Sequence, residues 1–251
     1  MKTRHPLLLI GLVVTFASAR AQGNALLDSA QAAYARGAYA DALALYDSVY
    51  QEQTSAALLF NIGNCHMKLD DVPHAVLFYE RAIRLEPGAE DIRANLDHAR
   101  QQVVDRIHEL PAFTLGSFWD RLRGGKDEDQ WARRALWSCL ALFAGATAFL
   151  FVRQGLVRRL LLGGTALALI CTVVATALGA YRVKEVNDRS EAIIMLPKVD
   201  VLGEPRQGAT TVFVLHEGTK ISVLSDQNGW YEVKLASGSV GWAPPGSLER
   251  I

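Results

Sequence analysis

Residues 57–89 read ALLFNIGNCHMKLDDVPHAVLFYERAIRLEPGA, and this stretch decides the fold of the N-terminal half of the chain. Small residues, Gly63 and Ala75, stand where two helices would cross closely. Tyr79 is the aromatic residue that would fill the space between helix pairs, and Pro87 ends the pattern because proline cannot continue a helix. The stretch therefore predicts a pair of packed helices.

A similar pattern lies about 33 residues earlier, with Ala30, Ala42 and Tyr46 at the equivalent positions. This pattern resembles the tetratricopeptide repeat, which extends over about 34 positions. The first copy lacks the closing proline, since Thr54 stands there. We expect repeats at about 24–54 and 57–89, followed by a capping helix over 90–109, which such stacks need.

The first helix of each repeat is expected to form a small concave surface for a partner. Six residues on it are the candidate contacts, with a solvated helix face as the alternative for each: Gln31, Tyr34, Phe60, Asn64, Met67 and Lys68.

From Glu191 onward the apolar period falls to two, which indicates β-strands. The expected strands are 212–215, 220–224, 230–235 and 239–242, separated by glycine-containing turns. About five such strands predict a small closed barrel, which leaves no exposed sheet edge. The two Gly-Trp pairs, Gly229-Trp230 and Gly241-Trp242, make residues 182–251 resemble a bacterial SH3-like domain.

Three aromatic residues of this domain are candidates for a ligand surface, because tryptophan is common at binding hot spots. They are Trp230, Tyr231 and Trp242. The alternative is that they cover the domain core. The eukaryotic proline-peptide groove needs an aromatic motif near the first strand, where this chain has Ala192 to Leu196, so polyproline binding is not expected.

The N-terminus has the three parts of a secretory signal peptide. Lys2 and Arg4 precede an apolar run over 7–16, and an Ala-x-Ala sequence ends at Ala21. We expect residues 1–21 to be removed by cleavage after Ala21, with Ala19 as the other possible site. The alternative is an uncleaved anchor.

Two later segments, 135–152 and 160–181, carry no charge and meet the length of about 18–20 residues for a transmembrane helix. The alternative is a pair of buried core helices. The intervening loop, 153–159, carries three arginines and no acid, so the positive-inside rule predicts that it is cytoplasmic. A two-helix protein of the bacterial inner membrane, with both globular modules extracytoplasmic, follows from this topology. Residues 110–134 would form a juxtamembrane linker, lying in the membrane plane or as an ordinary connection.

Composition excludes other classes of protein. The chain has 251 residues, with 26 Lys and Arg against 26 Asp and Glu, so it lacks the basic excess of most nucleic-acid binders. Hydrophobic residues make up 50% of the chain, which excludes a disordered protein. Residues 22–110, which include the expected repeat region 22–109, have 7 basic and 13 acidic residues, and a solvated acidic exterior or a basic partner would explain that imbalance.

No catalytic or cofactor-binding pattern is evident. The histidines are spread along the chain without metal-ligand spacing, and His216-Glu217-Gly218-Thr219-Lys220 lacks the second histidine of a zinc-protease motif. Gly124-Gly125-Lys126 lacks the strand and first glycine of a phosphate loop. Cys65, Cys139 and Cys171 are too few and too far apart for a disulfide framework. We expect a protein that is not an enzyme and that has no cofactor.

The whole arrangement resembles the BatE-like family of the Bacteroides aerotolerance operon, which combines tetratricopeptide repeats, a membrane hairpin and a bacterial SH3-like domain. Two stretches carry the resemblance: Asn95 to Arg100 continuing into Val104-Asp105-Arg106-Ile107, and Val212 to Lys220. The resemblance implies a bacterium of the Bacteroidetes type. It also implies partners among membrane proteins with von Willebrand factor A domains and a MoxR-type AAA+ ATPase.

Two functions fit these features. The first is a non-catalytic inner-membrane scaffold that presents the repeats and the SH3-like domain to extracytoplasmic partners. The second is a cell-envelope sensor or anchor whose SH3-like domain binds peptidoglycan or another wall ligand.

Overall fold

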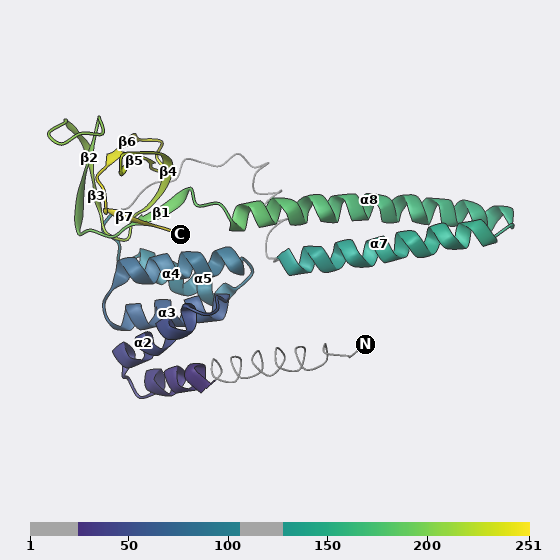
Figure 1. Ribbon diagram of the computed structural model, residues 1–251, viewed down its shortest axis with the longest axis horizontal. Helices are drawn as coiled ribbons and strands as arrows, with labels where there is room; N and C mark the ends of the chain where they lie inside the picture. Colours follow the sequence, from purple (N-terminus) through teal and green to yellow (C-terminus); the bar gives the residue numbers. More distant parts are fainter. Residues whose placement is uncertain (1–24, 106–127) are drawn as a thin grey trace, which may run out of the picture. The chain divides into compact units, whose positions relative to one another are not determined.

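The computed structural model describes residues 25–105 and 128–251 (Figure 1). The chain divides into two compact units. The first unit contains the repeat helices up to Ala82, residues 91–105 and the β-strands from residue 190 onward. The second contains a pair of long helices. The expected signal peptide, 1–21, and most of the expected linker lie outside the described residues.

The repeat region consists of consecutive short helices. Residues 25–35 are helical, and the helices that follow are α2 (Tyr39–Tyr50), α3 (Ala56–Lys68), α4 (Val72–Leu85) and α5 (Glu90–Arg100). Ser55 caps α3, since its side chain accepts a hydrogen bond of 3.2 Å from the backbone N–H of Leu58. Tyr46 and Tyr79 are both buried, as the repeat pattern predicts.

Close packing of α3 against α4 depends on Gly63. A Cβ atom at this position would lie 2.7 Å from the ring carbons Cδ1 and Cε1 of Tyr79. Ala30 and Ala75 are also completely buried, so the small residues of the pattern do lie at helix contacts.

The capping helix is shorter than the sequence predicts. α5 ends at Arg100 instead of continuing toward residue 109, and the following residues turn away from the helical path. The backbone N–H of Gln102 donates to the carbonyl of Ala99, and that of Val103 donates to the carbonyl of Arg100. These tight turns replace the next helical turn and bring Asp105 to the β-domain, as described below.

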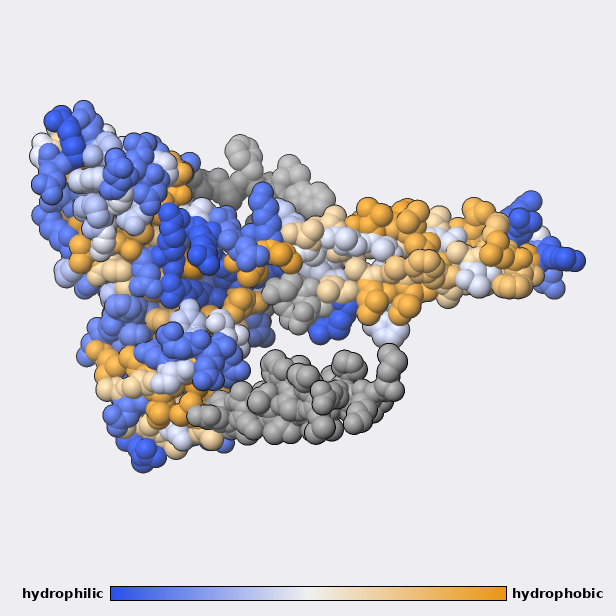
Figure 2. All heavy atoms as spheres, viewed as in Figure 1, coloured by the Kyte–Doolittle hydropathy of each residue, from blue (hydrophilic) through white to orange (hydrophobic). Residues whose placement is uncertain are grey.

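The second unit is an antiparallel helical hairpin of α7 (Glu128–Phe151) and α8 (Gly155–Val186). The sequence predicts a seven-residue loop, but α8 already begins at Gly155, so Arg158 and Arg159 belong to its first turns. The hairpin surface is largely hydrophobic, with a hydrophilic tip where the helices join (Figure 2). Both helices are long and apolar enough to cross a membrane.

Small side chains bring the two long helices together. A Cβ atom at Gly145 would lie 2.5 Å from the Cγ2 atom of Thr165, and one at Gly179 would lie 3.4 Å from the Cβ atom of Trp131. Between these points, the Thr172 hydroxyl donates to Ser138 Oγ at 3.1 Å. Small residues at such positions let helix backbones approach closely.

The C-terminal β-domain is one seven-stranded sheet in the order β3-β2-β6-β5-β4-β1-β7. Its strands are β1 (Glu191–Ile194), β2 (Lys198–Leu202), β3 (Thr211–His216), β4 (Lys220–Gln227), β5 (Trp230–Lys234), β6 (Val240–Ala243) and β7 (Leu248–Arg250). All the pairings are antiparallel. The prediction of a closed barrel is therefore wrong. The end strands β3 and β7 each pair with one neighbour only, which leaves the sheet open between them.

The inner face of the sheet forms a separate hydrophobic core. Its members alternate along the strands, as period-two patterning requires. They are Ala192, Ile194, Val199, Val201, Leu215, Ile221, Val223, Val233 and Ala243. The helical repeats, the two apolar helices and the separate antiparallel β-domain are thus confirmed as the parts of this chain.

Candidate functional site

The six repeat residues predicted to contact a partner differ in exposure. Gln31 and Lys68 are exposed, and the other four are half-buried. Tyr34 packs edge-on against Tyr39, with ring centroids 5.1 Å apart, and Phe60 packs against Tyr79 at 5.9 Å. Gln31 and Lys68 therefore offer the freest side chains of this predicted surface.

Asn64 has a structural role within the repeat. Its Oδ1 atom accepts a hydrogen bond of 2.7 Å from the hydroxyl of Tyr79 and one of 3.0 Å from Nδ2 of Asn95. It therefore connects α3 to both α4 and α5. Replacing Asn64 would leave the hydroxyl of the buried Tyr79 without this acceptor, so such a variant would report on stability as well as on partner binding.

The three aromatic residues of the β-domain do not form one surface. Side chains alternate along β5, and Val233 belongs to the core, so Tyr231 lies on the core face and packs against it. Trp230 and Glu232 lie on the opposite face, and Glu232 is directly opposite Trp242 of β6. The structure therefore groups the two tryptophans on the outer face and separates Tyr231 from them.

The repeats and the β-domain are joined through a buried carboxylate. The side chain of Glu80, on α4, is only 4% exposed and accepts from Arg100 of α5 at 2.5 Å and from Lys220 of β4 at 3.0 Å. Lys220 also pairs with Glu191 at 2.9 Å. Glu80 therefore links two repeat helices to the sheet.

A row of three neighbouring residues on the sheet faces the same helix. In the strand register, Ile193 of β1 lies opposite Lys220 of β4 and Glu249 of β7. Cross-strand partners share a face, and the Glu249 carboxylate accepts from Arg81 of α4 at 2.9 Å. Ile193 is completely buried although it points away from the inner core, so this outer face of β1 is covered by α4.

A second junction is formed by Asp105, which follows α5. Its carboxylate accepts from the backbone N–H of His216 at 2.7 Å, from Nδ1 of His216 at 2.8 Å and from the hydroxyl of Thr219 at 2.7 Å. Nearby, a Cβ atom at Gly218 would lie 2.8 Å from the Cγ2 atom of Val103. The turn between β3 and β4 is thus fixed on the segment after α5.

The Asp105 junction predicts a pH-dependent contribution to stability. Burial would raise the pKa of Asp105, but the hydrogen bonds from His216 and Thr219 outweigh it and hold the pKa below its usual value. The stabilisation is therefore present above about pH 4 and is lost as the pH falls through the lowered pKa. Asp105→Asn should lower the free energy of unfolding by about 2 kcal/mol at pH 7.

Thermal unfolding of wild type and Asp105→Asn at a series of pH values measures this contribution. The difference in Tm should be largest at neutral pH and should shrink in acid, below pH 4. A difference that stays constant down to pH 2 would show that the carboxylate charge does not matter.

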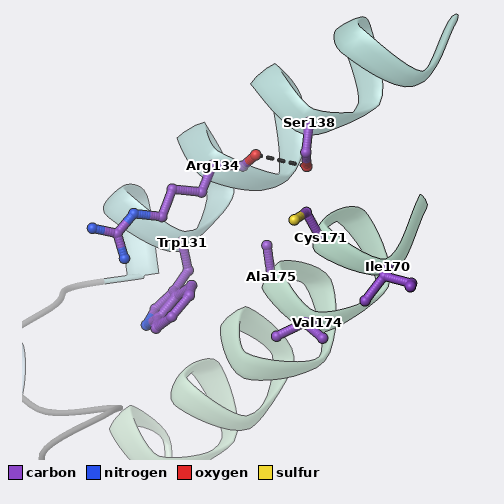
Figure 3. Close-up of a pocket in the computed structure, with 7 residues that line it drawn as sticks. All are labelled: Trp131, Arg134, Ser138, Ile170, Cys171, Val174 and Ala175. Carbon is purple, nitrogen blue, oxygen red and sulfur yellow. Dashed lines mark hydrogen bonds between the residues drawn. The ribbon is translucent and has the colours of Figure 1, made fainter. Parts of the chain in front are cut away.

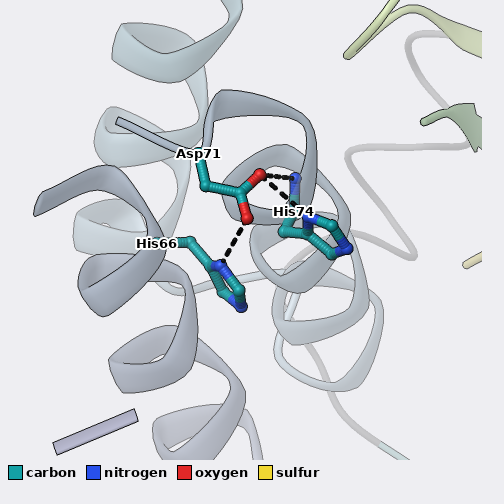
Figure 4. A group of neighbouring side chains, drawn as sticks. All are labelled: His66, Asp71 and His74. Atoms are coloured by element: carbon teal, nitrogen blue, oxygen red, sulfur yellow. Dashed lines mark hydrogen bonds and ion pairs between the residues drawn. The ribbon is translucent and has the colours of Figure 1, made fainter. Parts of the chain in front are cut away.

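A cluster of two histidines and one aspartate, which the sequence did not reveal, lies at the turn between α3 and α4. His66 Nδ1 is 3.0 Å from Asp71 Oδ2, and His74 Nδ1 is 2.8 Å from Asp71 Oδ1 (Figure 4). Burial lowers the pKa of His66 despite the opposing effect of Asp71. Burial would raise the pKa of Asp71, but the hydrogen bond and charge of His74 outweigh it and lower the pKa. The spacing His66-x4-Asp71-x2-His74 predicts that these side chains lie together only if His66 is known to lie in the last turn of one helix and His74 in the first turn of the next.

The helical hairpin contains a cavity of about 380 Å³ between its two helices (Figure 3). It is lined by Trp131, Arg134 and Ser138 of α7 and by Ile170, Cys171, Val174 and Ala175 of α8. The Arg134 guanidinium lies 5.0 Å from the ring centroid of Trp131. Most of the lining is apolar, and nothing in the hairpin marks this cavity for a particular ligand.

Comparison with protein families identifies two modules. Residues 56–89 match the tetratricopeptide repeat, and residues 198–249 match the bacterial SH3 domain. No curated protein matches the chain. Both matched families are typically non-catalytic interaction modules. The chain is therefore a multidomain protein built from a helical repeat, a bacterial SH3 domain and two apolar helices.

Proposed function

We propose that this chain is a non-catalytic, membrane-anchored scaffold that presents its repeats and its SH3 domain together to protein partners. The observation that carries the proposal is the direct joining of the two interaction modules through Glu80 and Asp105. Two modules held in a fixed relation can bind two sites at a high effective concentration. A flexible tether between them would give less of this advantage.

The membrane anchor in this proposal is the helical hairpin. Large apolar side chains such as Leu150, Phe151 and Leu160 are strongly exposed on it, and exposed apolar surface of this extent needs a covering such as lipid. With a signal peptide removed after Ala21 and an arginine-bearing tip in the cytoplasm, both modules would be extracytoplasmic at the bacterial inner membrane.

The partners proposed for this scaffold are those of a Bat-type aerotolerance complex. They are membrane proteins with von Willebrand factor A domains, acting with a MoxR-type AAA+ ATPase. Support comes from the two stretches that carry the family resemblance, since Asp105 of the first contacts His216 and Thr219 of the second. The two stretches that resemble the family therefore meet at one junction between the repeats and the β-domain.

Crosslinking in intact cells, followed by affinity capture of the full chain from detergent extracts, tests the scaffold. Wild type should recover von Willebrand-type membrane proteins, and a Gln31→Ala/Lys68→Glu variant should recover at least several-fold less. Arg36→Glu is the matched control, because Arg36 is exposed in the turn after the first helix and outside the predicted surface. Equal recovery by all three chains would overturn the assignment of this surface.

A second candidate function is wall binding by the SH3 domain. The match to the bacterial SH3 domain and the outer-face position of Trp230 and Trp242 favour it. Sedimentation of the detergent-solubilised full chain with purified peptidoglycan tests it. Trp242→Ala should weaken binding if the outer face is the wall-binding surface, whereas binding that is absent in wild type would remove this candidate.

A further inference from the structure

The cluster of His66, Asp71 and His74 is fixed by the backbone of the turn between α3 and α4. The N–H of Asp71 donates to the carbonyl of His66 at 2.9 Å, and that of Asp70 donates to the carbonyl of Met67 at 3.4 Å. Asp70 has a positive φ of 60°. These features define a Schellman motif, which ends α3 and sets Asp71 beside His66.

The following helix fixes the third member. Asp71 directly precedes α4, and its Oδ1 atom lies 3.4 Å from the backbone N–H of His74, the geometry of a helix N-cap. The imidazole rings of His66 and His74 stack with centroids 5.0 Å apart, and the ring of Phe78 also stacks with that of His66, at 5.5 Å. The three side chains are therefore held in place before any ligand arrives.

We propose that His66, Asp71 and His74 form a binding site for a divalent transition-metal ion such as Zn²⁺. Their candidate ligand atoms all lie within 4.8 Å of one another. Two imidazoles and one carboxylate are a donor set that suits zinc and its neighbours in the first transition row and disfavours Mg²⁺ and Ca²⁺.

The distances between the candidate ligand atoms are close to those that such an ion requires. Zinc bonds of about 2.0–2.2 Å to nitrogen and oxygen place neighbouring ligand atoms about 3.3 Å apart in a tetrahedral site. The Nδ1 atom of His66 is 3.0 Å from Oδ2 of Asp71, and that of His74 is 2.8 Å from Oδ1, so both pairs would separate by a few tenths of an ångström. Because all candidate ligand atoms lie within 4.8 Å of one another, any wider pair would have to close by no more than about 1.5 Å. On binding through Nδ1, each neutral imidazole would carry its proton on Nε2 instead.

The site is partly open, which leaves room for water as a fourth ligand. The side chains of Asp71 and His74 are 34% and 40% exposed, whereas that of His66 is 12% exposed. The carboxylate of Asp47 contributes to the electrostatic field at His66 and adds negative charge that favours a cation. The metal would thus join the last turn of α3 to the first turn of α4, within the repeat that matches its family.

Zinc binding by the full, detergent-solubilised chain, stripped with a chelator and purified with a histidine-free tag, tests the proposal. ZnCl₂ should raise the Tm of wild type with increasing concentration, because a ligand that binds the folded state stabilises it, and MgCl₂ should not. Co²⁺ should give the visible absorption of a four-coordinate site. These two readouts report binding independently of any partner.

His74→Gln should weaken zinc binding at least tenfold and abolish the Co²⁺ absorption, since removal of even an outer-shell partner costs about 10–100-fold. His98→Gln is the matched control, because His98 is exposed on α5 and outside the cluster. Asp71→Asn keeps an N-cap oxygen but removes the charge, and it serves if His74→Gln does not fold. Zinc affinity that is equal in wild type, His74→Gln and Asp71→Asn would overturn the proposal.

Discussion

Replacing both Arg100 and Lys220 with alanine is expected to lower the free energy of unfolding of the repeat–sheet unit by about 3–5 kcal/mol. Glu80 is 4% exposed and loses both of its cationic partners in this variant. A buried carboxylate without a cationic partner destabilises the folded state, because no ion pair compensates for the loss of its hydration. Denaturant unfolding of the full chain in detergent, followed by circular dichroism, measures the loss.

The matched variant is the same double substitution combined with Glu80→Met. A buried ion pair can be replaced by packed apolar side chains at little cost, so this triple variant should recover most of the stability. Glu80→Gln alone should cost less than the double variant, because Lys220 keeps Glu191 and Arg100 is partly exposed. A triple variant that is no more stable than the double variant would contradict the role given to the buried charge.

Gly63→Leu is expected to separate α3 from α4 and to lower the free energy of unfolding by about 3 kcal/mol. The first added carbon would already lie 2.7 Å from the Tyr79 ring, which is 1% exposed and has no room to move. Overpacking alone costs about 1–3 kcal/mol, and displacement of Tyr79 would also break its hydrogen bond to Asn64. Hydrogen exchange of the α3 and α4 amides measures the effect locally.

Ala57→Leu is the control, because it introduces the same side chain at an exposed position of the same helix. Surface substitutions of this kind usually change stability by less than about 0.5 kcal/mol. If Gly63→Leu protects α3 and α4 from exchange as well as Ala57→Leu does, then the close approach at Gly63 is not needed for the repeat.

The repeat helices and four of the seven strands could be predicted because their signals are local. Gly63, Ala75 and Tyr79 record the packing of one helix pair within 17 residues of sequence, and alternation along β3 to β6 records one buried face. The other three strands, β1, β2 and β7, were not predicted. Ala192, Ile193 and Ile194 are all buried, so β1 shows no alternation, because α4 covers the face that would otherwise meet water.

The two junctions and the histidine cluster could not be predicted from local patterns. Glu80 occurs in a run of helix residues like any exposed acid, and its partner Lys220 lies 140 residues further along the chain. Asp105 and His216 are 111 residues apart. Trp230 and Tyr231 are consecutive in one strand, so alternation alone places them on opposite faces, whereas the position of Trp242 opposite Glu232 depends on the pairing of β5 with β6.

The contact between Asp105 and His216 also limits how many times the chain between them can cross a membrane. Two residues that touch must lie in the same compartment, so the chain between them crosses a membrane an even number of times or not at all. If both hairpin helices cross, that condition is met. If only one inserts, the junction never closes, and Glu80 never meets Lys220. A chain in which only one helix has inserted would therefore keep its sheet apart from its repeats. Such a chain would lack the stabilisation that the junction gives and would be degraded by proteases more readily than a correctly inserted one.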